Sequence, residues 1–228
     1  MTESRMPFRM GQLSSHIYDA NRLVLIGPML KKKMNESALS TLGLLTTPQI
    51  ALDGGIKYAP RPDLWVGDGD SAGVVHPDIP YFAKLNQDET DFQFCLQQIH
   101  SWAWSELHIF GMLGGRRDHE WANLGAVYSA AKYKAGFRKA IFYGSCFESE
   151  FYILPKGETK IQIEGLFSLL AFEPAVVTLS GQCQYPANKI ELEPFSGRGI
   201  SNLGFGLINV ESNVPMLIYL TENAEGRI

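Results

Sequence analysis

The sequence predicts an α/β fold, in which a mostly parallel sheet with flanking helices is followed by a smaller antiparallel β-sandwich domain. Over residues 1–150, short apolar segments alternate with segments of helical spacing, which is typical of a parallel sheet covered on both faces. Over residues 151–228, the helical spacing stops, and short alternating runs are separated by Gly, Pro and Asn, as in antiparallel strands. We therefore expect an α/β domain at 1–150 and a β-rich domain at 151–228.

Each expected element has its own signal in the sequence. Short apolar runs predict buried strands at 22–26, 49–52, 63–66, 106–113 and 139–143. Apolar residues at i, i+3, i+4 and i+7 predict two amphipathic helices. These apolar positions are Phe92, Cys95, Leu96 and Ile99 in the first helix and Leu124, Val127, Tyr128 and Ala131 in the second. Alternating runs in the second part predict strands at 160–163, 176–179, 189–192 and 216–220.

The composition excludes several classes of function. The chain has 228 residues, with 20 Lys plus Arg against 24 Asp plus Glu, so it has no broad basic face for binding nucleic acid. The first residues contain no continuous apolar stretch, so we expect no secretory signal. No apolar run reaches 18 residues, so we expect no helix that spans a membrane. The three cysteines form no CxxC pair, which fits a reducing compartment. We expect a cytoplasmic protein.

Polar clusters lie where the predicted strands end. Asp53-Gly54-Gly55, Gly67–Ser71 and Gly114–His119 each come directly after a strand, and Asn86–Asp91 precedes the first helix. Ligands of parallel sheets bind beyond the carboxyl ends of the strands, so these clusters are candidate sites. Each cluster alone also has a structural alternative, an exposed turn or a helix cap. Their number within one domain favours function.

The acidic residues predict a site for a hard cation. If the segment is extended, Asp68 and Asp70 lie on one side of the chain, where the two carboxylates repel each other unless a cation neutralises them. Mg²⁺ or Ca²⁺ prefers such oxygen ligands, and an EF-hand is excluded because no Glu stands at the twelfth position. With Asp91 as a third ligand, the sequence predicts a Mg²⁺-dependent phosphoryl- or pyrophosphoryl-transfer enzyme.

The glycine-rich clusters predict contacts to phosphate. The N–H groups of Gly54 and Gly55 can face a phosphate, and Arg116 beside a glycine pair supplies forked donors at a helix start. GxxxxGK[ST] and GxGxxG are both absent, which excludes a P-loop and a dinucleotide site. His119 is either a proton carrier or a structural residue at the helix start.

Taken in order, these segments resemble the thiamin pyrophosphokinase family. The resemblance covers about residues 22–220, and the order and spacing of the motifs are more specific than any single motif. The segments that carry it are Asp53-Gly54-Gly55, Pro62–Ser71, Gln87–Leu96, Gly114–Leu124 and Ile200–Asn202.

The resemblance implies an α/β catalytic domain, a C-terminal β-domain that binds thiamin and forms the dimer, and a homodimer with active sites at the interface. It implies transfer of a pyrophosphoryl group from ATP to the hydroxyl of thiamin, giving thiamin diphosphate and AMP. The residues implied are Asp68, Asp70 and Asp91 for Mg²⁺; Asp53, Gly54, Gly55, Arg116 and Asp118 for ATP; Gln87, Ser201 and Asn202 for thiamin; and Asp70, Asp91 and Arg116 for catalysis.

Three positions depart from the family pattern. Gly69 stands where a bulky apolar residue is usual, Arg117 where Phe is common, and Gln184 where an aromatic residue stacks on thiamin, with Tyr185 one position later. Two alternatives stay open, and Gly69 and Gln184 are what support the first of them. One is a pyrophosphokinase acting on another small alcohol, such as a hydroxymethylpterin. The other is a non-catalytic regulator that binds thiamin or a nucleotide.

Overall fold

The computed structural model describes residues 13–70, 78–144 and 147–221. The chain divides into two compact units: unit 1 comprises residues 1–126 and 142–148, and unit 2 comprises residues 127–141 and 149–228. Helix α4 (Arg117–Tyr133) and strand β6 (Lys139–Tyr143) contain residues of both units. The expectations that concern Ser71 and Cys146 lie outside the described residues.

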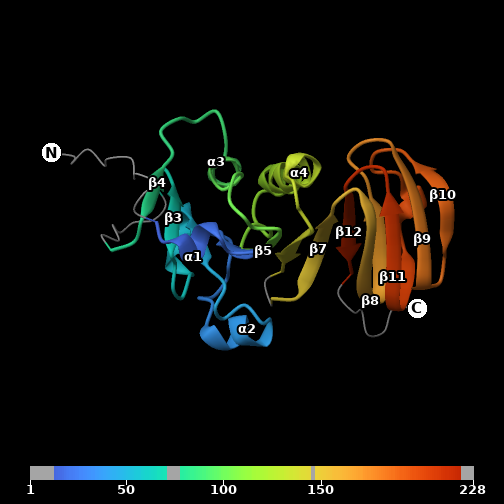
Figure 1. Cartoon of the computed structure of the whole chain (residues 1–228), viewed down its shortest axis with the longest axis horizontal. Coiled ribbons are helices and arrows are strands. Elements are labelled where there is room, and N and C mark those ends of the chain that lie inside the picture. Colours follow the sequence, from blue (N-terminus) through green and yellow to red (C-terminus); the bar gives the residue numbers. More distant parts are fainter. Residues whose placement is uncertain (1–12, 71–77, 145–146, 222–228) are drawn as a thin grey trace. The chain divides into compact units, whose positions relative to one another are not determined.

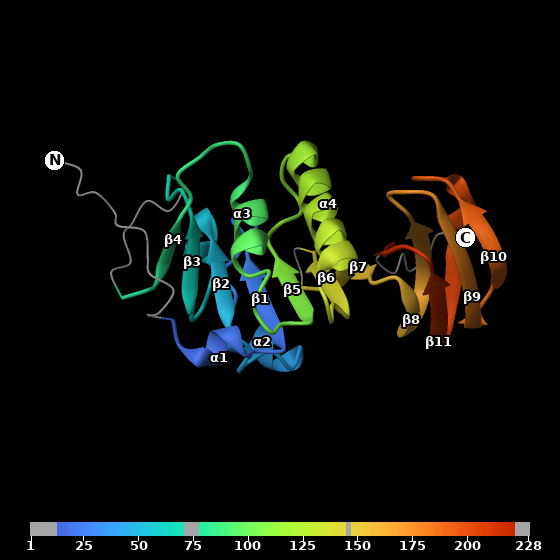
Figure 2. The ribbon, with the colours of Figure 1, turned by 45° about the horizontal axis from the view of Figure 1, so that its top comes forward.

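Unit 1 contains a parallel sheet whose strands lie side by side in the order β5-β1-β2-β3-β4 (Figure 2). All four pairs are parallel, so the carboxyl ends of the strands lie along one edge. The residues of β1, β2, β3 and β5 are almost all buried, as expected for strands covered on both faces. The bounds are β1 (Arg22–Ile26), β2 (Gln49–Leu52), β3 (Leu64–Gly67), β4 (Tyr81–Ala83) and β5 (Glu106–Phe110).

Short helices cover this sheet. Helix α3 (Asp91–Gln98) lies on one face and α2 (Glu36–Thr41) on the other, while α1 (Ser15–Tyr18) precedes β1 (Figure 1). Helix α3 begins at a capping box, in which the Thr90 hydroxyl accepts from the Gln93 amide and the Gln93 side chain accepts from the Thr90 amide. Its predicted apolar positions are buried. Within the described ranges, no helix has the length and apolar character needed to cross a bilayer.

The 3₁₀ turn η2 (Asp53–Lys57) follows β2, and its first residues pack closely against the backbone at the end of β1. A Cβ added at Gly55 would lie 1.9 Å from the carbonyl oxygen of Ile26, at the end of β1. Only glycine fits at this contact.

Replacing Gly55 with alanine should therefore lower the free energy of unfolding by at least about 3 kcal/mol, because neither backbone can give way cheaply. Denaturant unfolding measures the change. Gly125→Ala is the matched control, since its Cβ meets nothing within 4 Å and it lies inside α4, where alanine should add about 0.5 kcal/mol. Similar stability of the two variants would contradict the packing argument.

Unit 2 is an antiparallel sheet in the order β10-β9-β11-β8-β12-β7. Its inward side chains form one hydrophobic core, in which Phe167 and Ile208 are fully buried. The bounds are β7 (Ser149–Leu154), β8 (Gly157–Leu170), β9 (Ala175–Cys183), β10 (Ala187–Leu192), the 3₁₀ turn η3 (Gly197–Gly199), β11 (Asn202–Ser212) and β12 (Met216–Leu220).

The sheet content is thus mixed, with parallel pairs in unit 1 and antiparallel pairs in unit 2. All five expected strands of the first part and all four of the second are present. Those at 22–26, 49–52, 139–143 and 216–220 have the expected bounds, and the other five have shifted ends. Strand β5 stops at Phe110, short of the expected 113, because Gly111 takes a φ of 66°. Strands β4, β7 and β11 were not expected. In β11, two of the inward positions are Gly204 and Gly206, which hide the alternation of apolar residues.

An ion pair within unit 2 joins α4 to the segment between β8 and β9. The Lys132 ammonium lies 2.8 Å from the Glu173 carboxylate, which also accepts from the Tyr128 hydroxyl at 3.0 Å. The hydrogen bond from Lys132, followed by that from Tyr128, holds the pKa of Glu173 below its ordinary value of 4.5.

A carboxyl group with a lowered pKa in the fold stabilises the protein above its ordinary pKa and loses that contribution as the pH falls through the folded pKa. We therefore expect Glu173→Gln to lower the melting temperature by about 2 °C near neutral pH, because the pair is solvent-exposed. The difference from the parent protein should shrink as the pH falls below 4.5 and should vanish once Glu173 is protonated in the folded protein as well. Calorimetry across the pH range checks this, and a difference that persists in acid would contradict it.

Candidate active site

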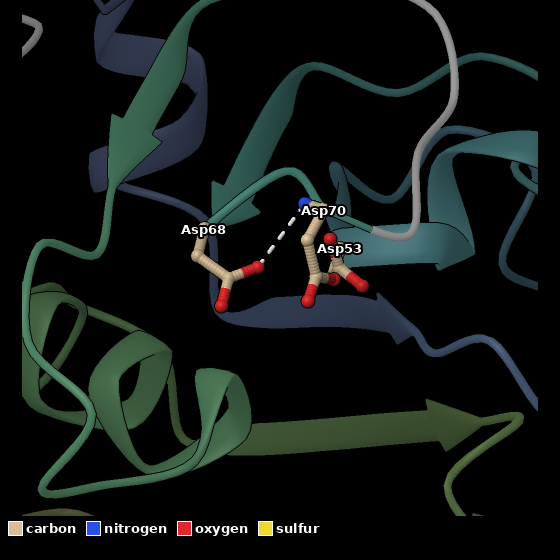
Figure 3. A group of neighbouring side chains, drawn as sticks. All are labelled: Asp53, Asp68 and Asp70. Carbon is tan, nitrogen blue, oxygen red and sulfur yellow. Dashed lines mark hydrogen bonds between the residues drawn. The ribbon is translucent and has the colours of Figure 1, made fainter.

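Three carboxylates meet at the carboxyl end of the unit 1 sheet (Figure 3). Asp53 comes directly after β2, and Asp68 and Asp70 follow β3, the parallel neighbour of β2. One carboxylate oxygen of each lies within 4.8 Å of those of the other two. The structure therefore brings Asp68 and Asp70 together, as expected, and adds Asp53, which the resemblance assigns to ATP.

Asp53 is held in a buried position that its charge alone would disfavour. It is 6% exposed and takes a φ of 43°, and among the described residues no donor reaches its Oδ1. Its carbonyl oxygen accepts from the indole of Trp65 at 3.1 Å. A Cβ at Gly67 would lie 3.0 Å from the Asp53 Cβ, so the glycine lets the two segments approach. A buried carboxylate oxygen without a donor fits a ligand that is a cation.

The segment that carries Asp68 and Asp70 is a tight turn, which corrects the expectation of an extended segment. The Asp70 amide donates to Asp68 Oδ1 at 3.2 Å (Figure 3). Gly69, between them, takes a φ of 77°, in the left-handed region that favours glycine. This conformation explains the departure from the family's bulky residue, because a branched apolar side chain would be strained there.

Hydrogen bonds and a nearby cation stabilise the ionised form of Asp68. The Gln87 side chain donates to its Oδ2 at 3.2 Å. Burial acts to raise the pKa of Asp68, but the Asp70 amide, the Gln87 amide and the charge of Lys84 together hold that pKa below 3.8. Gln87, implied as a contact to thiamin, therefore lies beside the acidic group.

Asp91 faces the same cavity from the first turn of α3. The Lys84 ammonium lies 3.5 Å from its Oδ1, and Asp91 does not belong to the group of three carboxylates described above. Burial raises the pKa of Asp91, and the negative charges of Asp68 and Asp53 add to this, while Lys84 opposes it. Lys84 is a site residue that sequence reasoning missed, since a lone lysine after a three-residue strand gives no signal.

These residues line one cavity of about 510 Å³, which is large enough for part of a nucleotide or a small cofactor. Its walls come from the ends of β2 and β3, the segment before α3, the loops after β1 and β5, and α4. The lining residues important here are Asp53, Asp68, Asp70, Lys84, Gln87, Asp91, His119 and Asn123. Gly54 and Gly55 lie outside its lining, because they are buried in the turn after β2.

The glycine–arginine cluster forms a smaller cavity of about 200 Å³ beside the loop after β5. The amides of Gly114 and Gly115 both donate to the Glu120 carboxylate, at 2.7 and 3.1 Å. Arg116 lines this cavity and forms an exposed ion pair with Asp118. Sequence reasoning missed Glu120, although its position in the first turn of α4 is the signal that could have found it.

The residues implied for thiamin in unit 2 lie around the turn between β9 and β10. The Asn202 side chain accepts from the Tyr185 amide at 3.0 Å and donates to the Tyr185 carbonyl at 2.8 Å. Ser201 takes a φ of 60°, and its amide donates to the Ser168 hydroxyl. Tyr185 is exposed, so Asn202 holds the backbone beneath an accessible aromatic ring.

The residues present fit a Mg²⁺ ion. Asp53, Asp68 and Asp70 supply carboxylate oxygens, the ligand type that Mg²⁺ prefers, and the cavity beside them leaves room for phosphate and water. The buried Asp53 Oδ1 without a donor is the observation that supports a cation rather than an exposed acidic turn.

The comparison with known proteins concerns the segment in which these residues lie. Residues 46–138 match the family model described as "Thiamin pyrophosphokinase, catalytic domain". The family resemblance is confirmed. This segment contains all three carboxylates of the acidic group, as well as Lys84, Asp91, Arg116 and Asp118. Among curated proteins, none matches the sequence.

Solved thiamin pyrophosphokinases share the fold. The Bacillus subtilis enzyme superposes with a TM-score of 0.69 at 21% identity, over 88% of this chain and 99% of the other. The enzyme from Candida albicans gives 0.65 at 16% identity, over 90% and 89% of the two chains. The yeast enzyme gives 0.64 at 15% identity, over 94% and 93%. At these identities the likeness concerns the fold.

Proposed function

We propose that this chain is a thiamin pyrophosphokinase, which transfers the terminal pyrophosphoryl group of ATP to the hydroxyl of thiamin and releases thiamin diphosphate and AMP. The main support for the proposal is that Asp53, Asp68 and Asp70 lie together at one cavity. All three lie within the segment that matches the family model of the catalytic domain. A shared fold alone would not require these carboxylates to converge. Their convergence also disfavours a regulator that only binds thiamin or a nucleotide.

Asp53, Asp68 and Asp70 would hold Mg²⁺, and Asp91, the third ligand implied by the resemblance, lies across the same cavity beside Lys84. When bound, the ion neutralises the triphosphate oxygens and orients them for displacement. This proposal moves Asp53 from the ATP contacts to the metal ligands. Gly54 and Gly55, implied for ATP, would serve mainly to place Asp53.

Positioning and charge would dominate the chemistry, because the protein need form no covalent bond to the substrate. The hydroxyl oxygen of thiamin would attack the β-phosphorus of ATP, and the bond from that phosphorus to the oxygen that bridges it to the α-phosphorus would break. AMP would leave with that oxygen, and the hydroxyl proton would pass to solvent. Arg116, with Asp118 orienting its guanidinium, would bind the triphosphate beside the amides of Gly114 and Gly115. His119 lines both cavities and would contact the nucleotide.

The finer organisation also follows from the resemblance. We propose a catalytic domain at 1–150 and a β-sandwich domain at 151–228 that forms a homodimer, with each active site at the interface. Gln87, Ser201 and Asn202 would then contact thiamin, with Tyr185 as the stacking aromatic residue that Asn202 positions. The location would be cytoplasmic.

Incubation of the protein with ATP, Mg²⁺ and thiamin tests the function. We expect AMP and thiamin diphosphate in equal amounts, and none after EDTA removes the metal. AMP formation that requires a hydroxymethylpterin instead of thiamin would reassign the acceptor. Binding of thiamin and ATP without any AMP would show a regulator and overturn the proposal.

A further inference from the structure

Lys84 is a buried cation at the acidic cavity, and its position is fixed at both ends. Its backbone amide continues the ladder of β4 by donating to the Gly67 carbonyl at 2.9 Å, directly before Asp68. Its ammonium donates to the Glu89 carbonyl at 2.9 Å and lies 3.5 Å from Asp91 Oδ1. The side chain is 4% exposed. Such an ammonium remains charged in a protein interior only beside compensating anions.

The charges around the cavity give Lys84 a specific effect. Six acidic side chains line it, and among the described residues that do so Lys84 is the one lysine or arginine. Its charge favours the ionised forms of both Asp68 and Asp91. A carboxylate that is paired with an ammonium is less available as a metal ligand. The ammonium also repels any divalent cation that binds near it.

We propose that Lys84 is a positioning residue that acts as a resident counter-cation of the cavity. It holds Asp91 as an ion-pair partner and leaves Asp53, Asp68 and Asp70 to bind the divalent cation. The inference rests on the metal site of the proposed function. In the absence of a nucleotide, the cavity should therefore bind divalent ions more weakly than it would if Lys84 were uncharged.

Three variants separate the charge of Lys84 from its packing. Lys84→Met keeps the length of the side chain and removes the charge, whereas Lys84→Arg keeps the charge. Lys132→Met is the matched control, because it removes another ion-paired lysine, the partner of Glu173, outside the lining of the cavity. Circular dichroism verifies that each variant is folded.

The test is a titration of the full-length protein with Mn²⁺, followed by electron paramagnetic resonance, without nucleotide or thiamin. We expect Lys84→Met to bind Mn²⁺ about tenfold more tightly than the parent protein, because one nearby positive charge is removed and Asp91 is released. Lys84→Arg and Lys132→Met should stay within about threefold of the parent protein.

A second step asks whether Lys84 acts through Asp91. In an Asp91→Asn background, Lys84→Met should change the Mn²⁺ affinity by less than about threefold, since only the direct repulsion by the ammonium is then removed and no carboxylate is released. An unchanged affinity in folded Lys84→Met, or a full tenfold effect in the Asp91→Asn background, would overturn the inference while leaving the metal site intact. Absence of Mn²⁺ binding by the parent protein would overturn the inference together with the metal site.

Discussion

Asp70→Asn should abolish product formation, with kcat falling by about 10³-fold or more. The substitution removes one of the three charges that would hold the divalent cation under the proposed function, and a neutral amide oxygen binds Mg²⁺ weakly. The fold should survive, because Asp70 is exposed and its bond to Asp68 comes from the backbone amide, which any residue supplies. The melting temperature without divalent ions should change by less than about 2 °C.

Coupled detection of AMP and chromatography of thiamin diphosphate measure this loss. Asp78→Asn is the matched control, because it makes the same chemical change at an exposed residue outside the cavity lining and should keep kcat within about twofold. Normal turnover by Asp70→Asn would remove the basis of the metal-site assignment.

Asp53→Asn should make the metal-free protein more stable while reducing kcat by at least about 10²-fold. In the absence of a cation, a buried carboxylate lies close to Asp68 and Asp70 and gains no hydrogen bond at its Oδ1. Replacing it with a neutral amide relieves this repulsion and should add about 1 kcal/mol to the free energy of unfolding. Asparagine also tolerates the positive φ at this position.

Denaturant unfolding in EDTA and in Mg²⁺ tests both parts of this expectation. Mg²⁺ should stabilise the parent protein by mass action and should leave Asp53→Asn almost unchanged. Asp53→Ala separates charge from backbone conformation, since alanine at a φ of 43° costs about 1 kcal/mol relative to asparagine. Lower stability of Asp53→Asn than of the parent protein in EDTA would show that the carboxylate has a partner, contrary to our interpretation.

The parts of the fold and site that depend on local patterns could be predicted from the sequence. The face of α3 that contains Phe92 and Cys95 follows from helical spacing, and its cap follows from a threonine three residues before a glutamine. The place of Asp68 and Asp70 at the carboxyl end of a parallel strand could be predicted in the same way, although a tight turn at Gly69, and not the expected extended segment, brings the two together.

The other features of the fold and the site depend on contacts between segments that are distant in the sequence. The spacing of residues along the chain gives no information about such contacts. Asp53 joins the acidic group because β2 pairs with β3 and because Gly67 allows the two segments to approach. Lys84 enters the cavity because β4 pairs with β3, and a three-residue strand carries too little pattern to be predicted. Strand β11 was missed because glycines occupy inward positions where apolar side chains would show the alternation.

The backbone amides of Gly114 and Gly115, which donate to the Glu120 carboxylate, determine how an anion could bind in the smaller cavity. Gly114 and Gly115 already donate to an oxygen that belongs to the chain, so the loop keeps a defined shape before any ligand arrives. A phosphate oxygen that binds here, as the proposed function requires, would exchange one acceptor for another, and the number of hydrogen bonds to these amides would stay the same. Binding at this loop would then replace one anion by another, with a small enthalpy change at the amides and little loss of conformational freedom.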